Sequence, residues 1–408
     1  MASAPGAEEV APTLAAPLSA SSDRPDLDLA TIFRAHRHEL TLRGLEAKVV
    51  ERLVACRTAA LGGHLYRCEG CRHELPVYNP CQDRHCPKCH GRKQAQWVED
   101  REKDLLPVPY FHLVFTIPKE LHAVLMANRK VGYGLLFRAA SRTILDVAKS
   151  RLKATPGVLA VLHTWTQTLL FHPHIHCVVT GGGLSLDGKR WAHTGARFFM
   201  SVRRLGEVFR GKLMEGLNRA LAKGELEFDV AQAKRHFARA ARHRFGVYAK
   251  APFAGPSAFL KYISRYVHRV AISDRRIVDY DGQRVTFEYR DRRQDNLLRR
   301  MTLPAAAFLW RFLSHLLPKG FVKIRGYGLL ANRGKADRIE RCRQLLGPMP
   351  DLHAEDGKSG EEDAVADPDA DADHGRDACP KCSKRMVRVE TLKPDPAAAG
   401  AAPTRSPP

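Results

Sequence analysis

The chain has 408 residues, enough for two or three domains, and its 66 lysines and arginines against 44 aspartates and glutamates give a formal net charge of +22. This excess favours a polyanionic partner such as nucleic acid, although a basic solvated surface would fit the charge equally well. No run approaches the ~18 apolar residues of a membrane span, and prolines interrupt the first residues, which argues against a bilayer-spanning or secreted protein.

The first elements in chain order are a tail and a helical segment. Residues 1–28 are rich in alanine, proline and serine and are expected to be disordered. Apolar residues then recur at helical spacing over 29–54, and a cysteine-rich segment occupies 56–90. A helix is expected to resume over about 91–105.

Six of the ten cysteines form CxxC pairs, which in a chain without a signal peptide indicates metal binding in a reducing cytosol rather than disulfides. Fourteen residues separate the pair Cys68/Cys71 from the pair Cys86/Cys89, a spacing close to that of a zinc ribbon. Two such turns would place four thiolates around a structural Zn²⁺ with no open position. Four further residues could replace a ligand or form a second site, namely Cys56, Cys81, His85 and His90.

A third CxxC pair, Cys379/Cys382, lies near the C-terminus and needs partners to bind a metal. Cys342 is the one unassigned cysteine nearby in the sequence, and an exposed pair without metal is an equally good interpretation. The pair follows residues 351–377, which hold eleven acidic and two basic residues, a net charge of −9. We expect this stretch to be a solvated linker and the alanine- and proline-rich end of the chain to be a disordered tail.

Between the cysteine segments both strands and helices are expected, and the expected fold class is α+β. The periodicity predicts strands at 111–117, 158–170, 175–180, 276–280 and 284–290, and helices at 120–153, about 200–240, 256–270 and 304–317.

The sequence FHPHIHCVVT contains His174 and His176 on either side of one apolar residue. Alternate side chains of a strand share a face, so both imidazoles point to one side and could hold a divalent cation. A third ligand is required, and Gln167 is preferred because it could lie opposite in an antiparallel pairing, with His163 and His172 as alternatives. Ordinary histidines on a half-buried strand are the competing interpretation.

The segment AFLKYISRYVHR carries Tyr262 and Tyr266, which are four residues apart and therefore on one face of the expected helix. Basic neighbours would suit a phosphate, while packing of an amphipathic helix explains the same pattern. Tyrosine has a pKa of ~10 and is a weak nucleophile unaided, but a cation held by the histidines would polarise a scissile phosphate for its attack. The product would be a 5′-phosphotyrosine bond and a free 3′-OH, and rejoining would need no ATP. The basic residues expected to contact phosphate are Lys261, Arg265, Arg269 and Arg325.

Five colinear segments together resemble the rolling-circle transposases of the IS91 type, which are two-tyrosine HUH enzymes of bacterial insertion sequences. The segments are NPCQDRHCPKCHGRKQAQW, YFHLVFTIP, HPHIHCVVTGGGL, VYAKAPFAGPSAFLKYISRYVHRVAIS and LLPKGFVKIRGYGLLANR. The resemblance implies metal ligands at His174 and His176, nucleophiles at Tyr262 and Tyr266, and Mg²⁺ or Mn²⁺ as the catalytic cofactor. It also implies single-stranded DNA at the ends of the element as the partner, and a bacterial cytoplasmic protein that joins the nucleoid when bound to DNA.

The expected fold is an HUH-type endonuclease domain, with an antiparallel sheet core and flanking helices, preceded by a small helical and zinc-ribbon domain. The expected boundaries are 29–105 for the zinc-binding domain, 106–345 for the catalytic domain, 346–378 for the acidic linker and 379–408 for the CxxC segment and disordered tail. A plasmid or phage replication initiator or relaxase would share the chemistry. A zinc-dependent DNA-binding regulator without enzymatic activity would share the charge and the cysteines.

Overall fold

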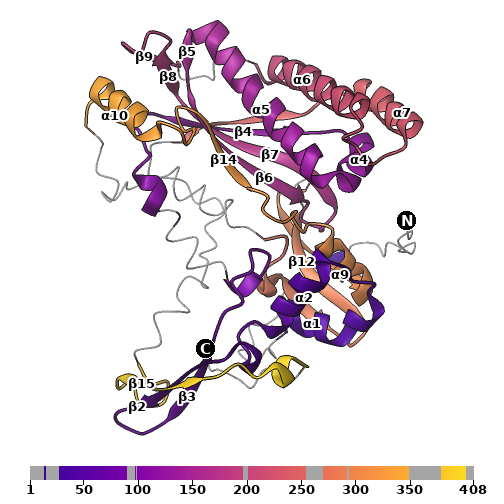
Figure 1. The fold of residues 1–408 in the computed structure, drawn as a ribbon, viewed down its shortest axis with the longest axis vertical. Helices are drawn as coiled ribbons and strands as arrows, with labels where there is room; N and C mark the ends of the chain where they lie inside the picture. Colours follow the sequence, from indigo (N-terminus) through magenta and orange to yellow (C-terminus); the bar gives the residue numbers. More distant parts are fainter. Residues whose placement is uncertain are drawn as a thin grey trace.

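The computed structural model describes residues 13–14, 27–89, 97, 99–195, 201–253, 270–291, 294–348 and 378–400. Within these residues, four antiparallel sheets and the surrounding helices confirm a mixed α and β architecture. The largest sheet lies in the upper half of Figure 1, a smaller sheet with its own helices lies below it, and a third sheet projects at the bottom.

The largest sheet has five strands in the order β10-β4-β7-β6-β14. The strands predicted at 111–117 and 175–180 are confirmed, and the strand predicted over 158–170 ends at Trp165 instead. The sequence did not predict the strands Val247–Phe253 and Ile324–Gly328. Apolar residues bury both faces of the sheet. The strands are β4 (Tyr110–Thr116), β6 (Gly157–Trp165), β7 (Phe171–Thr180), β10 (Val247–Phe253) and β14 (Ile324–Gly328).

Helices cover one face of this sheet, as Figure 1 shows for α5 and α6. Ile175 and Cys177 of β7 point to this side and belong to one core with both helices. The predicted helix over 120–153 is interrupted at Asn128, whose backbone leaves the helical region, so two helices replace one. The helices are α4 (His122–Ala127), α5 (Arg129–Leu152), α6 (Val202–Ala222) and α7 (Val230–Ala241).

A second core joins the N-terminal helices to a sheet from the middle of the chain. The ring of Phe33 contacts Phe312 edge-on at 5.8 Å, and both belong to the same cluster as Phe287. The expected boundary after residue 105 therefore does not separate two independent cores. The elements are α1 (Leu29–His36), α2 (Leu45–Ala55), β11 (Ile277–Tyr280), β12 (Arg284–Asp291), β13 (Leu297–Pro304) and α9 (Ala305–Leu313).

Both expected disordered termini contain ordered residues. The two-residue strand β1 (Thr13–Leu14) pairs with β13, and the C-terminal strand β15 (Met386–Leu392) pairs with β2. The sequence prediction missed these strands because each one pairs with a strand that is distant in sequence, and no local turn signals the pairing. The projecting third sheet has the order β15-β2-β3, with β2 at Gly63–Cys68 and β3 at Glu74–Tyr78.

A small sheet and a last helix complete the fold at one end of the large sheet. The strands are β5 (Ala154–Thr155), β8 (Gly182–Ser185) and β9 (Trp191–His193), and the helix is α10 (Lys335–Leu346). Short 3₁₀ helices are η1 (Arg37–Glu39), η2 (Ala59–Leu61), η3 (Pro87–Cys89), η4 (Lys119–Leu121), η5 (Asp274–Arg276) and η8 (Pro396–Gly400). Among the described residues, no helix combines the length and apolarity that a bilayer crossing requires.

Candidate functional site

Three histidines converge on the face of the large sheet opposite α5 and α6. The β6–β7 register places His163 directly across from His174, and His176 is two residues further along β7. One ring nitrogen from each of the three lies within 4.8 Å of the others. Three imidazoles this close together form a ready ligand set for one divalent cation.

Hydrogen bonds at Nδ1 orient two of the three rings. The Nδ1 of His174 lies 2.7 Å from the carbonyl oxygen of His172, and because a carbonyl only accepts, this nitrogen carries the proton. The Nδ1 of His176 lies 2.9 Å from Nε2 of His112 on β4. Both contacts engage Nδ1, and a hydrogen bond at one ring nitrogen is the usual way in which a ligating histidine is oriented towards a cation.

Gln167, the preferred third ligand, lies apart from the histidine pair. Gln167 does not lie opposite the histidines, because β6 ends at Trp165 and Gln167 falls in the turn that leads to β7. Its backbone carbonyl accepts a hydrogen bond from the Arg276 guanidinium. The position across from His174 belongs to His163, which the sequence suggested as an alternative.

The turn between β6 and β7 is held by the second core. Arg311 of α9 donates a hydrogen bond to the carbonyl of Thr168 at 3.0 Å, and His315 donates from Nε2 to the carbonyl of Leu169 at 3.0 Å. Leu169 itself is fully buried in that core. The turn joins β6, which holds His163, to β7, which holds His174. By fixing the turn, the second core therefore positions two of the three imidazoles.

Burial sets the protonation of two groups near the histidines. Burial lowers the pKa of His315 to about 4, so its ring is neutral near pH 7 and accepts at Nδ1 from Thr164 at 3.3 Å.

Burial, and secondarily the charge of Arg84, lowers the pKa of Lys323 to about 7. The Nζ of Lys323 lies 5.2 Å above the ring of Trp165, which stacks on His163 at 4.9 Å. Sequence reasoning did not single out Lys323, because its pKa depends on burial.

A cavity of about 390 Å³ lies over the same face of the large sheet, further along the strands. Leu159 and Val178 form part of its wall, and the strand alternation puts them on the same face of the sheet as the histidines. Trp97 and Tyr110 supply aromatic walls. The volume falls within the roughly 300–1,000 Å³ of small-ligand sites.

The tyrosine segment lies outside the described residues, and so do its neighbouring bases, which comprise Lys261, Tyr262, Arg265, Tyr266 and Arg269. The described chain on either side is attached to the large sheet or its turn. β10 ends at Phe253, which pairs with Tyr110 of β4, and Ile272 is buried in the second core together with Leu169.

Arg325, the remaining predicted phosphate contact, points away from the histidines. It pairs with Ala160 of β6 and therefore shares the face that packs on α5. Its guanidinium lies 4.3 Å from the ring of Phe137 and 4.9 Å from that of Phe321. The structure thus assigns Arg325 a packing contact and does not bring it to the histidine site.

The structure does not bring the four expected zinc ligands together. Cys86 and Cys89 lie with Cys56 and Cys81, whereas Cys68 and Cys71 lie with the C-terminal pair. In the first group the Sγ atom of Cys56 is 3.4 Å from that of Cys89 and 3.6 Å from that of Cys86. Four sulfurs bound to one zinc at about 2.3 Å lie roughly 3.8 Å apart, and a disulfide would need about 2.05 Å, so these distances fit zinc.

The loop of the first cysteine group is tied to the rest of the protein by its polar residues. Nε2 of His85 accepts from the backbone N–H of Leu317 at 3.1 Å, and Lys88 pairs with Asp28 at 2.5 Å. Arg84 donates to the carbonyls of Pro318 and Phe321, and to that of Leu317. The side chains of Arg84, His85 and Lys88 therefore make contacts within the protein and do not form a free basic surface.

The second cysteine group combines Cys68 and Cys71 with Cys379 and Cys382. The Sγ–Sγ distances are 3.4 Å for Cys68 and Cys382 and 3.6 Å for Cys71 and Cys379. Cys342, the partner suggested by proximity in sequence, is instead buried in α10 within an apolar cluster.

Two family models match the chain. Residues 29–117 match a transposase zinc-binding domain, and residues 157–337 match a family of putative transposases. The first range includes the whole of the first cysteine group, and the second includes the three histidines. Cys379 and Cys382 lie outside both ranges.

Two similar proteins are described as transposases. The putative transposase y4qJ of Sinorhizobium fredii is 43% identical over 335 residues, which cover 78% of this chain and 84% of the relative. The transposase for insertion sequence element IS801 of Pseudomonas savastanoi pv. phaseolicola is 29% identical over 348 residues, covering 82% of this chain and 84% of the relative. No solved structure matches.

Proposed function

Because this chain belongs to the IS91-type transposases, we propose that it transposes DNA by cutting and rejoining one strand through a tyrosine, with a divalent cation held by His163, His174 and His176. The observation that carries the proposal is the convergence of the three imidazoles on one face of the large sheet. In this proposal the large sheet is the core of an HUH-type nuclease domain, and single-stranded DNA at the element ends is the substrate.

The donor set favours one of the two expected cations. Three neutral imidazoles are borderline ligands, whereas Mg²⁺ prefers oxygen ligands and gives up its water reluctantly. We therefore expect Mn²⁺ to bind more tightly than Mg²⁺. A cation bound there would withdraw negative charge from the non-bridging oxygens of the scissile phosphate.

The protein's own groups would perform the substitution at phosphorus. The phenol oxygen of Tyr262 or Tyr266 forms a bond to phosphorus in line with the bond to the 3′ oxygen, which breaks. The phenol proton passes to a base, and the departing 3′ oxygen gains a proton to become a hydroxyl. Reversal by another 3′-OH rejoins a strand without ATP, since the phosphotyrosine bond retains the phosphodiester energy.

The proposal is tested by trapping the covalent product. Full-length protein is incubated with a labelled single-stranded oligonucleotide of the element end and Mn²⁺, and then denatured. A protein–DNA adduct is expected with the wild type. The variants Tyr262→Phe/Tyr266→Phe and His174→Ala/His176→Ala are expected to bind the oligonucleotide without forming the adduct.

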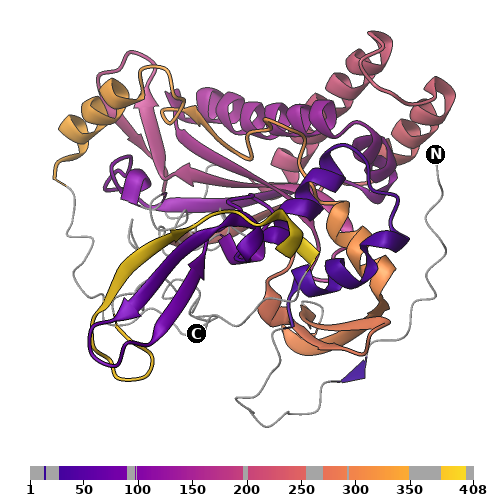
Figure 2. The same ribbon diagram turned by 60° about the horizontal axis from the view of Figure 1, so that its bottom comes forward.

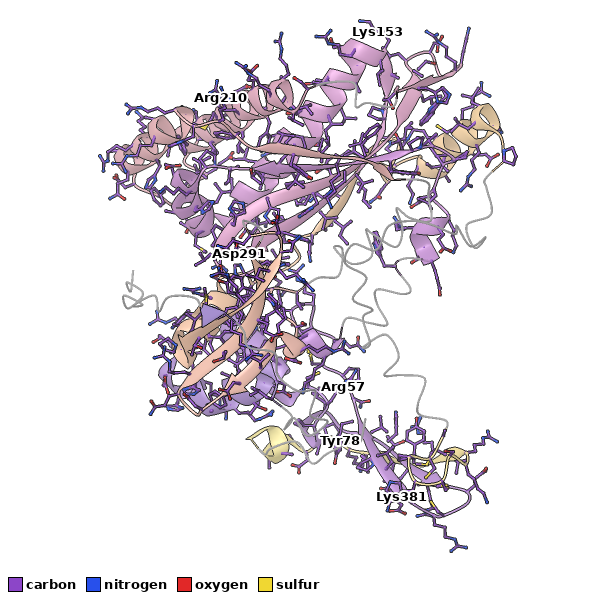
Figure 3. The ribbon with its side chains drawn as sticks, turned by 180° about the vertical axis from the view of Figure 1, so that it is seen from behind. Arg57, Tyr78, Lys153, Arg210, Asp291 and Lys381 are labelled. Carbon is purple, nitrogen blue, oxygen red and sulfur yellow. The ribbon has the colours of Figure 1, made fainter. Side chains whose placement is uncertain are left out.

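A matched control is Tyr78→Phe, because Tyr78 lies on the projecting sheet and not on the histidine face (Figure 3). It should form the adduct at the wild-type level. An adduct that persists in the double phenylalanine variant would exclude these tyrosines. Its absence from the wild type with Mn²⁺ and Mg²⁺, despite binding of the oligonucleotide, would favour a regulator that binds DNA without cutting it.

A further inference from the structure

We propose that a second zinc ion, bound by Cys68, Cys71, Cys379 and Cys382, joins the C-terminal segment of the chain to its N-terminal zinc-binding region. Neither family model reaches the C-terminal pair, because the matches end at residues 117 and 337. The proposal gives the third sheet, with strands β15, β2 and β3, a metal centre of its own.

The two halves of this site have the same backbone geometry. The N–H of Arg72 donates to the carbonyl of Cys68 at 3.1 Å, and the N–H of Ser383 donates to the carbonyl of Cys379 at 2.8 Å. Arg72 and Ser383 each follow the second cysteine of their CxxC pair and have a positive φ, at 58° and 55°. A left-handed residue is uncommon outside glycine, so its recurrence at the same place in both turns indicates a shared function.

Backbone amides point at one sulfur in each half. The N–H groups of Gly70 and Cys71 lie 3.3 Å and 3.5 Å from Sγ of Cys68, and the N–H of Lys381 lies 3.4 Å from Sγ of Cys379. Amide donors of this kind stabilise the negative charge of a thiolate, which is the form that binds zinc. These amides therefore favour metal binding over two neutral thiols.

The strand β15, which follows the C-terminal cysteine pair, pairs closely with β2 of the N-terminal region. Met386 pairs with Cys68 and Leu392 pairs with Gly63, so β15 follows the whole of β2. Figure 2 shows β15 in yellow beside the indigo strands. Gly62 has φ of +63°, and a Cβ there would lie 2.5 Å from the carbonyl oxygen of Leu392. Only glycine fits both constraints, which makes the C-terminal strand an integral part of this sheet.

The apolar contacts of this sheet are too few to hold it alone. Its buried cluster consists of Cys68, Cys379 and Met386, with Tyr66 and Leu75 packed against it. Two of the three buried residues are themselves cysteines of the proposed site. A small unit without a larger core generally needs a metal or a disulfide to stay folded. The Sγ–Sγ distances of 3.4 Å and 3.6 Å fit a zinc tetrahedron rather than disulfide bonds.

The test is the zinc content of the full-length protein. Protein purified under reducing conditions is measured by native mass spectrometry and elemental analysis, and two zinc ions per chain are expected. The variant Cys379→Ser/Cys382→Ser should carry one zinc ion, because half of the second site is removed while the first group stays intact. The matched control Cys342→Ser should carry two.

A second readout does not depend on any variant being well folded. Limited proteolysis within residues 349–377 should leave the C-terminal fragment attached to the wild-type protein while zinc is bound, and a strong chelator should release it. One zinc ion in the wild type, or two in Cys379→Ser/Cys382→Ser, would overturn the proposal. So would peptide mapping under non-reducing conditions that finds a disulfide within this group in freshly purified protein.

Discussion

His163 on β6 faces His174 on β7 across the antiparallel ladder, and the two rings meet edge-on with their centroids 5.6 Å apart. This pairing adds a third imidazole to the two that alternate along β7. The site is therefore a property of the hairpin as a whole, and its geometry depends on the register between the strands.

The register predicts opposite outcomes for two substitutions. His163→Ala removes a nitrogen that faces the shared space, so we expect Mn²⁺ affinity to fall by at least about tenfold, together with DNA cleavage. Gln167→Ala should leave Mn²⁺ affinity and DNA cleavage unchanged, because Gln167 contacts Arg276 through its backbone carbonyl rather than its side chain. Isothermal titration with Mn²⁺ and a single-strand nicking assay measure the two effects.

His193→Ala is a suitable control for the loss of an imidazole, since His193 is exposed on β9. It should bind Mn²⁺ as the wild type does. If Gln167→Ala loses Mn²⁺ while His163→Ala retains it, the assignment of the third ligand is reversed.

The sequence predicted which face of the strand His174 and His176 share, but not which residue of the preceding strand lies opposite them. The alternation of His174, Ile175 and His176 indicates which side chains share a face, and the structure confirms it. The same periodicity cannot say which residue of the preceding strand lies opposite, because a shift of two residues preserves every face. Gln167 and His163 are four residues apart, which is twice such a shift, and because β6 ends at Trp165, His163 lies on the strand and Gln167 does not.

The cysteine partners show a different limit. CxxC pairs identify metal-binding turns, but spacing does not determine which turns share an ion, and the chain has more pairs than one site needs. The partner of Cys68 is Cys382, 314 residues away, and only the pairing of β15 with β2 brings them together. The same long-range pairing explains why the sequence suggested a disordered tail for a segment that contains a strand.

Removing the first cysteine group should damage the second core as well as the zinc content. Cys56 and Cys86 are each 1% exposed and belong to that core, so Cys86→Ser leaves a buried hydroxyl and loses a zinc ligand. We expect one zinc ion per chain and a clear fall in the thermal unfolding midpoint, since structural zinc contributes directly to folding. Elemental analysis and differential scanning calorimetry provide the measurements.

Loss of the second cysteine group should have a smaller effect on thermal stability than loss of the first. Cys379→Ser/Cys382→Ser should also lose one zinc ion, yet it should leave the main unfolding transition near that of the wild type, because the third sheet has little core of its own. Equal losses of thermal stability in the two variants would contradict this division of roles.

Arg311 links the second core to the histidine hairpin without facing the cation site. Arg311→Ala removes the charged donor to the Thr168 carbonyl, and hydrogen bonds from charged groups contribute about 1.5–3 kcal/mol. We expect a loss of stability of this order and weaker Mn²⁺ binding, because the turn between β6 and β7 is less firmly held. Urea denaturation and Mn²⁺ titration test the two parts, with Arg142→Ala on the exposed side of α5 as the control. Mn²⁺ affinity that stays at the wild-type value would show that the hairpin keeps its geometry without this brace.

His315 makes the stability of the protein depend on pH. Burial lowers its pKa to about 4 in the folded protein, whereas an unfolded histidine has a pKa of about 6.5. Between these values the unfolded chain binds a proton that the folded chain does not, so the free energy of unfolding falls as the pH decreases from 6.5 towards 4. The slope from one such group approaches about 1.4 kcal/mol per pH unit.

The variant His315→Gln isolates this contribution. A glutamine amide can still donate to the carbonyl of Leu169 but does not titrate, so its stability should fall less steeply over this pH range than that of the wild type. The zinc ligands and the three site histidines are the same in both proteins, and their protonation therefore cancels in the difference between the two curves. Urea denaturation at a series of pH values gives that difference. Parallel curves would mean that residue 315 is protonated to the same extent in the folded and unfolded states, and that its neutral role in holding the hairpin is wrong.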